Sequence, residues 1–117
     1  MSEHFVRDKS FAFALRVVKL CQYLNSEKKE FILSKQLLRS GTAVGALVRE
    51  AEQAESKADF VHKMAIALKE AKETEYWLDL LHQSGYISTK GFESIQPAIV
   101  ELLKLLTAII KTTRAKL

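Results

Sequence analysis

The chain has 117 residues, of which 48% are hydrophobic and 27% are charged, and its net charge is +4. This length favours one domain, 1–117, with a single hydrophobic core, and the composition argues against a disordered chain. Four glycines and one proline are too few for a turn-rich β-sandwich or barrel. The single cysteine, Cys21, excludes an intrachain disulfide framework and multi-cysteine metal sites.

The sequence lacks the signature of a membrane segment. The longest stretch without Asp, Glu, Lys or Arg has ten residues, 80–89, whereas a membrane-spanning helix needs about 20 apolar residues. The first ten residues, MSEHFVRDKS, contain no apolar core of a signal peptide. We therefore expect a cytoplasmic protein.

The charges are divided unevenly along the chain. Residues 1–49 carry a net charge of +5, residues 50–101 carry −5, and residues 102–117 carry +4 with no acidic side chain. Such an uneven distribution of charge is typical of proteins that bind a polyanion, but it also suits a chain whose ends pack against its middle.

Two helices are predicted in the first half of the chain. The first covers Lys9–Leu24, where apolar residues at helical spacing form two adjacent stripes. One stripe consists of Phe11, Leu15, Val18 and either Cys21 or Gln22, and the other of Phe13, Val17, Leu20 and Leu24. The second helix covers Lys35–Ala54, with Ser34 as its expected N-cap. Gly41 and Gly45 weaken this helix, and we interpret them as positions where another backbone approaches closely.

Two further helices are predicted in the second half. Ser56 with Asp59 resembles a capping box that starts the third helix, and Gly85 stands where a C′ glycine belongs. The fourth helix begins between Thr89 and Ser94. If Ser94 is its cap, Pro97 is tolerated in the first turn, and otherwise Pro97 kinks the helix. Four helices with short connections predict an all-α, antiparallel up-down-up-down four-helix bundle.

The first and fourth helices are more apolar than a small monomeric bundle requires. On the fourth helix the main stripe is widened by further aliphatic residues, which leaves a narrow polar line. The stripe contains Ile95, Ile99, Leu102, Leu106 and Ile109, the widening residues are Leu103, Leu105 and Ile110, and the polar line is Glu101, Lys104, Ala108 and Lys111. A core-facing helix needs an apolar arc of about 100°. We therefore expect something besides the parent bundle, most simply a second copy, to cover both helices.

Motifs for catalysis or metal binding are weak. Asp59-x-x-His62 and Asp79-x-x-His82 imitate a di-metal bundle pattern, but they lie on one helix about 30 Å apart and the first and fourth helices supply few glutamates. Cys21 lies in an apolar stripe, and no P-loop or Ser–His–Asp arrangement is present. We expect no enzyme activity, no cofactor and no metal, and a metal-binding bundle is the weakest alternative.

Polar residues among the core positions of the second and third helices call for partners. We expect Arg39 to pair with Glu70 or Glu73 and so to fix the register of the two helices, because buried charges persist only when they are paired. The alternative is that these residues face solvent. The basic residues near the chain ends are the candidate phosphate contacts, and they are Arg7, Arg16, Lys19, Lys111, Arg114 and Lys116.

Residues 34–81 resemble the four-helix-bundle family of proteins encoded in intervening sequences of bacterial 23S rRNA genes. The resemblance rests on Gln36–Ser40, Glu50-Ala51, Ser56–Phe60 and Ala67–Leu78, and it extends over nearly the whole chain. It implies a bundle that assembles as a ring-like homopentamer. A related family, the accessory proteins of diversity-generating retroelements, is basic and pentameric and binds a reverse transcriptase and nucleic acid.

The resemblance supplies no catalytic residues. We therefore expect a non-enzymatic homo-oligomeric scaffold that binds RNA or DNA through its basic segments. The alternative is a protein–protein adaptor ring that binds a partner protein and no nucleic acid.

Overall fold

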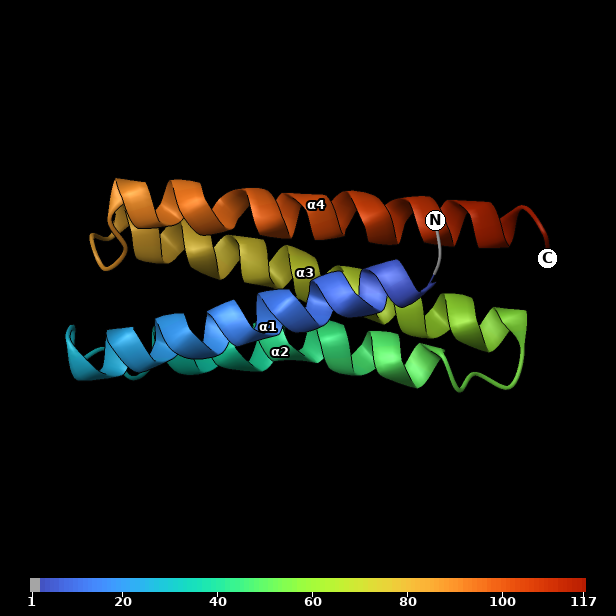
Figure 1. Ribbon diagram of the computed structural model, residues 1–117, viewed down its shortest axis with the longest axis horizontal. Helices are drawn as coiled ribbons and strands as arrows, with labels where there is room; N and C mark the ends of the chain where they lie inside the picture. The colour runs from blue at the N-terminus through green and yellow to red at the C-terminus, as the bar shows by residue number, and fades with distance from the viewer. Residues whose placement is uncertain (1–2) are drawn as a thin grey trace.

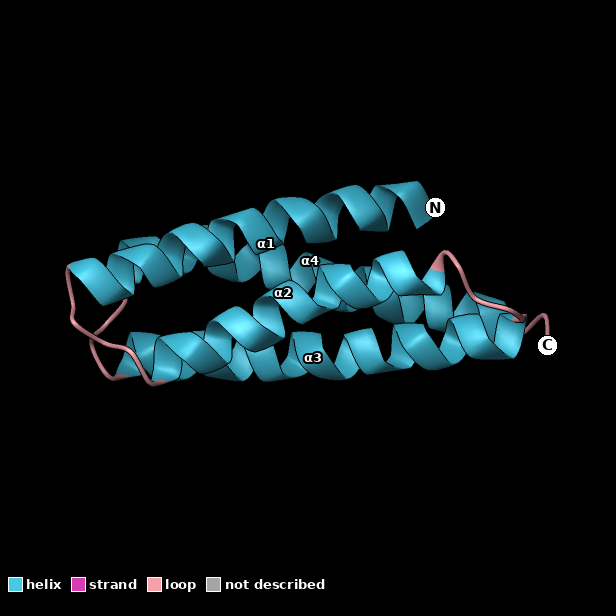
Figure 2. Ribbon diagram, turned by 90° about the horizontal axis from the view of Figure 1, so that it is seen from below, coloured by secondary structure: helices cyan, strands magenta, loops and turns pink. Residues whose placement is uncertain are grey.

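The computed structural model describes residues 3–117, which form four α-helices and no strand. The helices are α1 (Glu3–Ser26), α2 (Leu33–Ala51), α3 (Lys57–Gln83) and α4 (Thr89–Arg114). They pack as a rod of 47 × 21 × 19 Å, in which each helix turns back along the previous one (Figures 1 and 2). The all-α, four-helix prediction is therefore confirmed. Within the described part of the chain, no helix is both long enough and apolar enough to cross a bilayer.

Each helix contacts two neighbours. α1 packs on α2, α2 on α3, α3 on α4, and α4 closes the square against α1 with the sparsest contact. The layer formed by α1 and α2 therefore lies opposite the layer formed by α3 and α4. Lys9 pairs with Glu101 at 3.4 Å and Arg16 bonds to Ser94, so α1 and α4 run in opposite directions.

α1 begins six residues earlier than predicted. Val6 and Ser10 are fully buried and continue the core stripe of Phe13, Val17 and Leu24 by two more turns. Three side chains of the other stripe point away from the core and are 36–52% exposed; they are Phe11, Leu15 and Val18. The second predicted stripe therefore belongs to the core, and the first reaches the core only through Cys21, which is 3% exposed.

The start of α2 differs from the prediction. Ile32 occupies the N-cap position and makes no side-chain cap bond, whereas Ser34 lies buried inside the first turn. The Glu30 carboxylate replaces the predicted serine: it accepts hydrogen bonds from the backbone amides of Ile32, Leu33 and Ser34 at 3.1, 3.0 and 2.7 Å. Three of the four unpaired amides of the helix start are thereby satisfied by one side chain. α2 ends at Ala51, three residues before the predicted end.

The ends of α3 follow the predicted signals. The Ser56 side chain accepts from the Asp59 amide at 3.0 Å, and the Asp59 carboxylate accepts from the Glu55 amide at 3.2 Å. At the other end Gly85 has a φ of 90°, and the amide of Tyr86 bonds to the Leu81 carbonyl at 2.9 Å. This is the Schellman arrangement, in which a residue with positive φ satisfies the last carbonyls of the helix.

α4 starts at Thr89, and Ser88 is its N-cap, accepting from the Gly91 amide at 3.0 Å. Ser94 is therefore not the cap, and Pro97 lies inside the helix, which continues as one ribbon to Arg114 (Figure 1). The hydroxyl of Ser94 instead accepts a hydrogen bond from Arg16 at 2.8 Å.

The bundle itself covers most of the wide apolar arc of α4. Leu105 and Ile110 are 6% and 5% exposed, and Leu103 and Ile109 are half-buried against the core. The width of this arc therefore gives no support to the expected second copy, which stays a prediction. The outer stripe of α1, which is exposed, does support it.

Candidate nucleic-acid interface and assembly face

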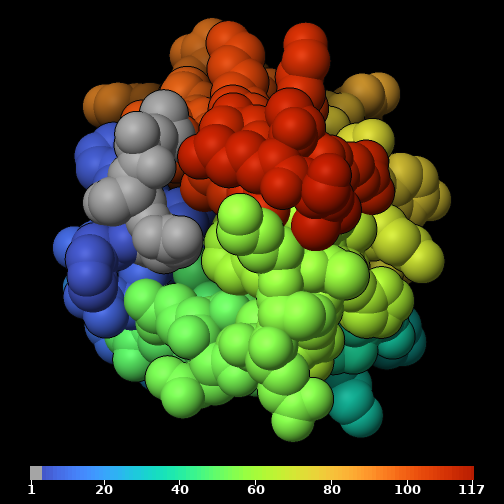
Figure 3. Space-filling model, turned by 90° about the vertical axis from the view of Figure 1, so that its right-hand side faces the viewer, coloured from blue at the N-terminus to red at the C-terminus, as the bar shows by residue number. Residues whose placement is uncertain are grey.

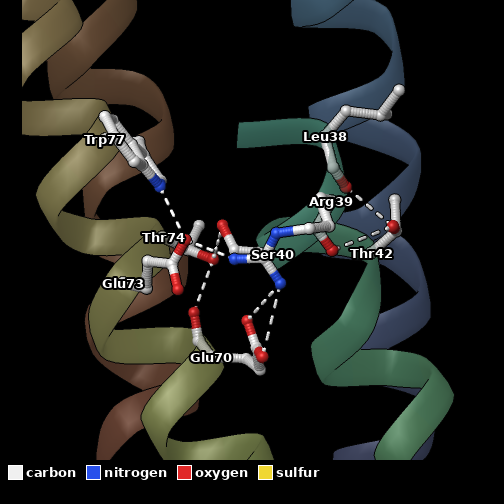
Figure 4. A network of polar contacts seen from close by, with 8 residues as sticks. All are labelled: Leu38, Arg39, Ser40, Thr42, Glu70, Glu73, Thr74 and Trp77. Atoms are coloured by element: carbon white, nitrogen blue, oxygen red, sulfur yellow. Dashed lines mark hydrogen bonds and ion pairs between the residues drawn. The ribbon is translucent and has the colours of Figure 1, made fainter. Parts of the chain in front are cut away.

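Arg39 and two glutamates form a polar network across α2 and α3 (Figure 4). The Arg39 guanidinium donates to Glu70 at 3.1 Å and, through its other terminal nitrogen, to Glu73. The Trp77 indole N–H donates to the same Glu73 carboxylate at 2.9 Å. These bonds from Trp77 and Arg39 lower the pKa of Glu73, and the bond to Glu73 raises that of Arg39. Arg39 and Glu73 therefore stay ionised over the physiological range.

The network lies at the surface rather than among core positions as expected. The Arg39 side chain is 49% exposed and that of Glu73 36%. The buried link between the two helices is instead a neutral one, in which the Thr74 hydroxyl donates to the Ser40 hydroxyl at 2.9 Å, and both residues are fully buried. These contacts place Ser40 level with Thr74 along the bundle axis and fix the register of α2 and α3.

Two of the predicted phosphate contacts are engaged within the bundle. Arg7 lies 3.5 Å from Glu52 and 3.6 Å from Asp8, and Arg16 donates to the carbonyl and hydroxyl of Ser94 at 3.1 and 2.8 Å. A guanidinium held by intramolecular partners must give them up to bind a phosphate. Arg7 and Arg16 are therefore weaker candidates than their charge alone suggested.

The other four predicted contacts are exposed and make no ion pair among the described residues; they are Lys19, Lys111, Arg114 and Lys116. Lys19 lies on α1, far along the rod from the other three. The other three belong to the C-terminal end of the chain, which lies beside the α2–α3 connection (Figure 3). The structure thus brings three of the six together and leaves three on α1.

Three more exposed lysines accompany the basic end of α4. The His82 ring stacks on Phe92 at 4.3 Å, and since α3 and α4 run in opposite directions, this contact sets Lys69 and Lys72 level with about residues 105 and 102 of α4. Lys104 lies between those levels. All three lysines are exposed and make no ion pair within the described chain. We call the set of Lys69, Lys72, Lys104, Lys111 and Arg114 the cationic band.

Lys69, Lys72 and Lys104 are not among the phosphate contacts predicted from the sequence. Lys104 belongs to the polar line of the fourth helix, and the net negative charge of residues 50–101 conceals the two lysines of α3. The signal that could have found them is their spacing of three residues on the outer side of the third helix, because its core positions exclude them.

A row of exposed apolar side chains marks the α1–α2 layer, on the side of the rod opposite the cationic band. Their exposed fractions lie between 36% and 58%, and we call them the apolar face: Phe11, Leu15, Val18, Phe31 and Leu38. Small residues of α2 continue this surface beside Phe11, and Arg49 lies over the Phe11 ring at 5.4 Å. A contiguous apolar surface of this kind is a mark of protein–protein contact.

The groups with metal-binding or nucleophilic potential have other roles. Asp59 caps α3 and lies 3.7 Å from Lys63, while His82 stacks on Phe92. In the described part of the chain, no three His, Cys, Asp or Glu side chains gather in a way that could hold a metal. Burial and, secondly, the charge of Glu30 raise the pKa of the Cys21 thiol to about 11, which keeps it protonated. Its Sγ donates to the Ser34 carbonyl at 3.3 Å.

Comparison with known proteins assigns the chain to a family. The 23S rRNA-intervening sequence proteins match over residues 2–108. The chain belongs to this family. A crystal structure of a protein of unknown function from the S23 ribosomal protein family of Bacteroides thetaiotaomicron is similar throughout, with 56% identity and a TM-score of 0.93. The similarity covers 95% of this chain and 99% of the other. No curated protein matches the chain.

Proposed function

We propose that this 23S rRNA-intervening sequence protein is a non-enzymatic, cytoplasmic, homo-oligomeric scaffold that binds RNA or DNA through phosphate contacts. The observation that carries the proposal is the segregation of two surfaces on one small bundle. The cationic band lies on the α3–α4 layer, and the apolar face lies on the opposite α1–α2 layer.

The cationic band suits a phosphate backbone better than a base-reading site. Its five cations are exposed and free of ion pairs within the described chain. Long basic side chains on a helix surface contact phosphates without reading bases, so we expect strong salt dependence and little sequence preference. Compared with the phosphate contacts predicted from the sequence, the proposed set leaves out Arg7 and Arg16 and keeps Lys111 and Arg114. It adds Lys69, Lys72 and Lys104.

The apolar face supports self-association. Assembly that covers the exposed Phe11, Leu15 and Val18 leaves the basic end of α4 free, so that each added copy contributes another set of cations. Repeated sets of cations on one particle raise the avidity for a long polyanion. The resemblance to the rRNA-intervening-sequence family favours a ring of five copies.

A protein adaptor is the second candidate, because the same apolar face could receive a different protein. In that case a partner protein co-purifies after nuclease treatment, and no nucleic acid does. Binding of labelled RNA and DNA to the purified assembly separates the two candidates.

The experiment titrates a fluorescent RNA hairpin and a DNA duplex of the same length with the protein at several salt concentrations. We expect the logarithm of the binding constant to fall linearly with the logarithm of salt, by about 0.9 per phosphate contact on duplex DNA. The triple variant Lys72→Gln, Lys104→Gln and Lys111→Gln should lower this slope, whereas Lys28→Gln, in the α1–α2 connection, should not. No binding at low salt, or a slope unchanged in the triple variant, contradicts the proposal.

A further inference from the structure

The part of the apolar face nearest the α1–α2 connection is flanked by two lysines. Lys19 follows Val18 on α1, and Lys35 lies one turn before Leu38 on α2. Both lysines are exposed and make no ion pair among residues 3–117. We call Leu15, Val18, Lys19, Lys35 and Leu38 the lysine-flanked patch.

A patch of opposite charge lies on α3 at the same height along the rod. Tyr76 is 57% exposed, and beside it stand the carboxylates of Glu75 and Asp79, for which the described chain provides no ion pair. We call these three residues the carboxylate patch.

Cross-helix contacts establish that the two patches are level. Cys21 of α1 bonds to Ser34 of α2, and Ser40 of α2 bonds to Thr74 of α3. Since consecutive helices run in opposite directions, Lys35 is level with about residue 79 of α3. By the same count Lys19 is level with about residue 36 of α2 and so with about residue 78 of α3. The bundle thus carries free cations on its α1–α2 layer and free carboxylates on α3, at one height.

This placement distinguishes two ways in which copies could meet. A two-fold contact centred on the lysine-flanked patch brings Lys19 and Lys35 of one copy against the same cations of the other, and like charges across an interface oppose association. A head-to-tail contact between parallel copies sets those lysines against carboxylates at the same height, with Tyr76 against the aliphatic side chains.

Resting on the proposed scaffold function, we infer that the lysine-flanked patch of one copy docks on the carboxylate patch of the next, so that this protein assembles head to tail. The occupant of the apolar face is a second copy of the chain. The two copies meet at the end of the rod that carries the α1–α2 connection. Lys69 lies on the other half of α3, whereas Lys72 lies one turn before Glu75, at the edge of the carboxylate patch.

A charge exchange tests the inference by light-scattering mass at low salt. One variant carries Lys19→Glu and Lys35→Glu, and a second carries Glu75→Lys and Asp79→Lys. We expect each variant alone to lose assembly and move toward the 13.3 kDa chain mass. The fourfold variant, and an equimolar mixture of the two, should regain it, because opposite charges face each other again. The matched control, Lys90→Glu with Glu50→Lys, should assemble like the parent.

Two results of this experiment would contradict head-to-tail assembly. In a two-fold contact through α1 and α2, the Glu75→Lys, Asp79→Lys variant assembles like the parent, which overturns the inference. A fourfold variant that is folded by circular dichroism but stays dissociated overturns it too. Nucleic-acid binding by the parent assembly, measured separately, shows whether the proposed function stands when the inference fails.

Discussion

Gly41 of α2 faces Val17 of α1 so closely that a Cβ atom at position 41 would lie 2.9 Å from both Val17 methyl carbons. Val17 is fully buried and branched at Cβ, so its methyl groups have no free direction in which to move. The tight contact between the first two helices therefore depends on the absence of a side chain at position 41.

Gly41→Ala should destabilise the bundle, and Gly45→Ala provides the matched control. A Cβ at position 45 would lie 3.4 Å from the Ser10 carbonyl oxygen, an ordinary contact. Replacing a helix-interior glycine with alanine contributes about 1 kcal/mol of propensity at both sites, but overpacking at position 41 costs about 1–3 kcal/mol. In urea, the free energy of unfolding should be higher for Gly45→Ala than for Gly41→Ala. The reverse order would contradict the tight contact between Gly41 and Val17.

The pH dependence of stability should report the carboxylate that caps α2. Burial alone raises the pKa of Glu30, but hydrogen bonds from the amides of Leu33, Ser34 and Ile32 outweigh it, and the folded pKa lies below the ordinary 4.5. The stability that Glu30 contributes is therefore present above the unfolded pKa and is lost as the pH falls through the folded value.

Glu30→Gln should remove this pH dependence of stability. It should also lower the free energy of unfolding by roughly 1 kcal/mol at neutral pH, because a neutral amide oxygen is a weaker cap than a carboxylate. Glu27→Gln, at an exposed position of the same connection, is the control. Thermal melts of the three proteins between neutral and acidic pH provide the comparison. If the melting temperatures of the parent and of Glu30→Gln change with pH in parallel, the carboxylate does not stabilise the start of the helix.

Arg39→Ala should lower the melting temperature, because it leaves the carboxylates of Glu70 and Glu73 side by side without their shared cation. A double-mutant cycle with Glu73→Gln isolates the coupling of the pair, and it should weaken as salt is added since the guanidinium is half exposed. Lys69→Ala, on the same layer as Glu70, serves as the control. An Arg39→Ala protein as stable as the parent excludes a register role for the network.

Cys21 should resist alkylation in the native protein. Its pKa is raised to about 11 and the residue is 3% exposed, so at about pH 8.5 little thiolate forms and none of it is accessible. Mass spectrometry after iodoacetamide treatment should show modification only once urea has unfolded the chain. Rapid labelling of the folded protein would mean that α1 opens locally at this residue.

The features predictable from the sequence are those fixed by local signals. Ser56 and Gly85 bound the third helix as expected, because an N-cap hydroxyl and a residue with positive φ act within a few residues of the helix end. The start of the second helix was predicted wrongly because its cap is a glutamate outside the helix. Glu30 reaches the amides only after the chain reverses at Lys29, where φ is 54°.

Features that depend on packing between helices could not be predicted. Two stripes of the first helix were equally apolar, and the contact of Val17 with Gly41 decides which one is buried. The cationic band joins Lys72 and Lys104, which are far apart in sequence, through the register of α3 and α4. The expected Arg39 pairing, by contrast, depended only on the types of side chain on two neighbouring helices.

Copies of this chain are proposed to assemble and to bind nucleic acid. Light-scattering mass with absorbance at two ultraviolet wavelengths, one dominated by nucleic acid and one by protein, tests both parts in a single run on nuclease-treated and untreated protein. We expect a protein mass of several 13.3 kDa chains in both samples, and nucleic acid that co-elutes from the untreated sample and is removed by salt. A monomer that elutes free of nucleic acid at low salt would contradict it.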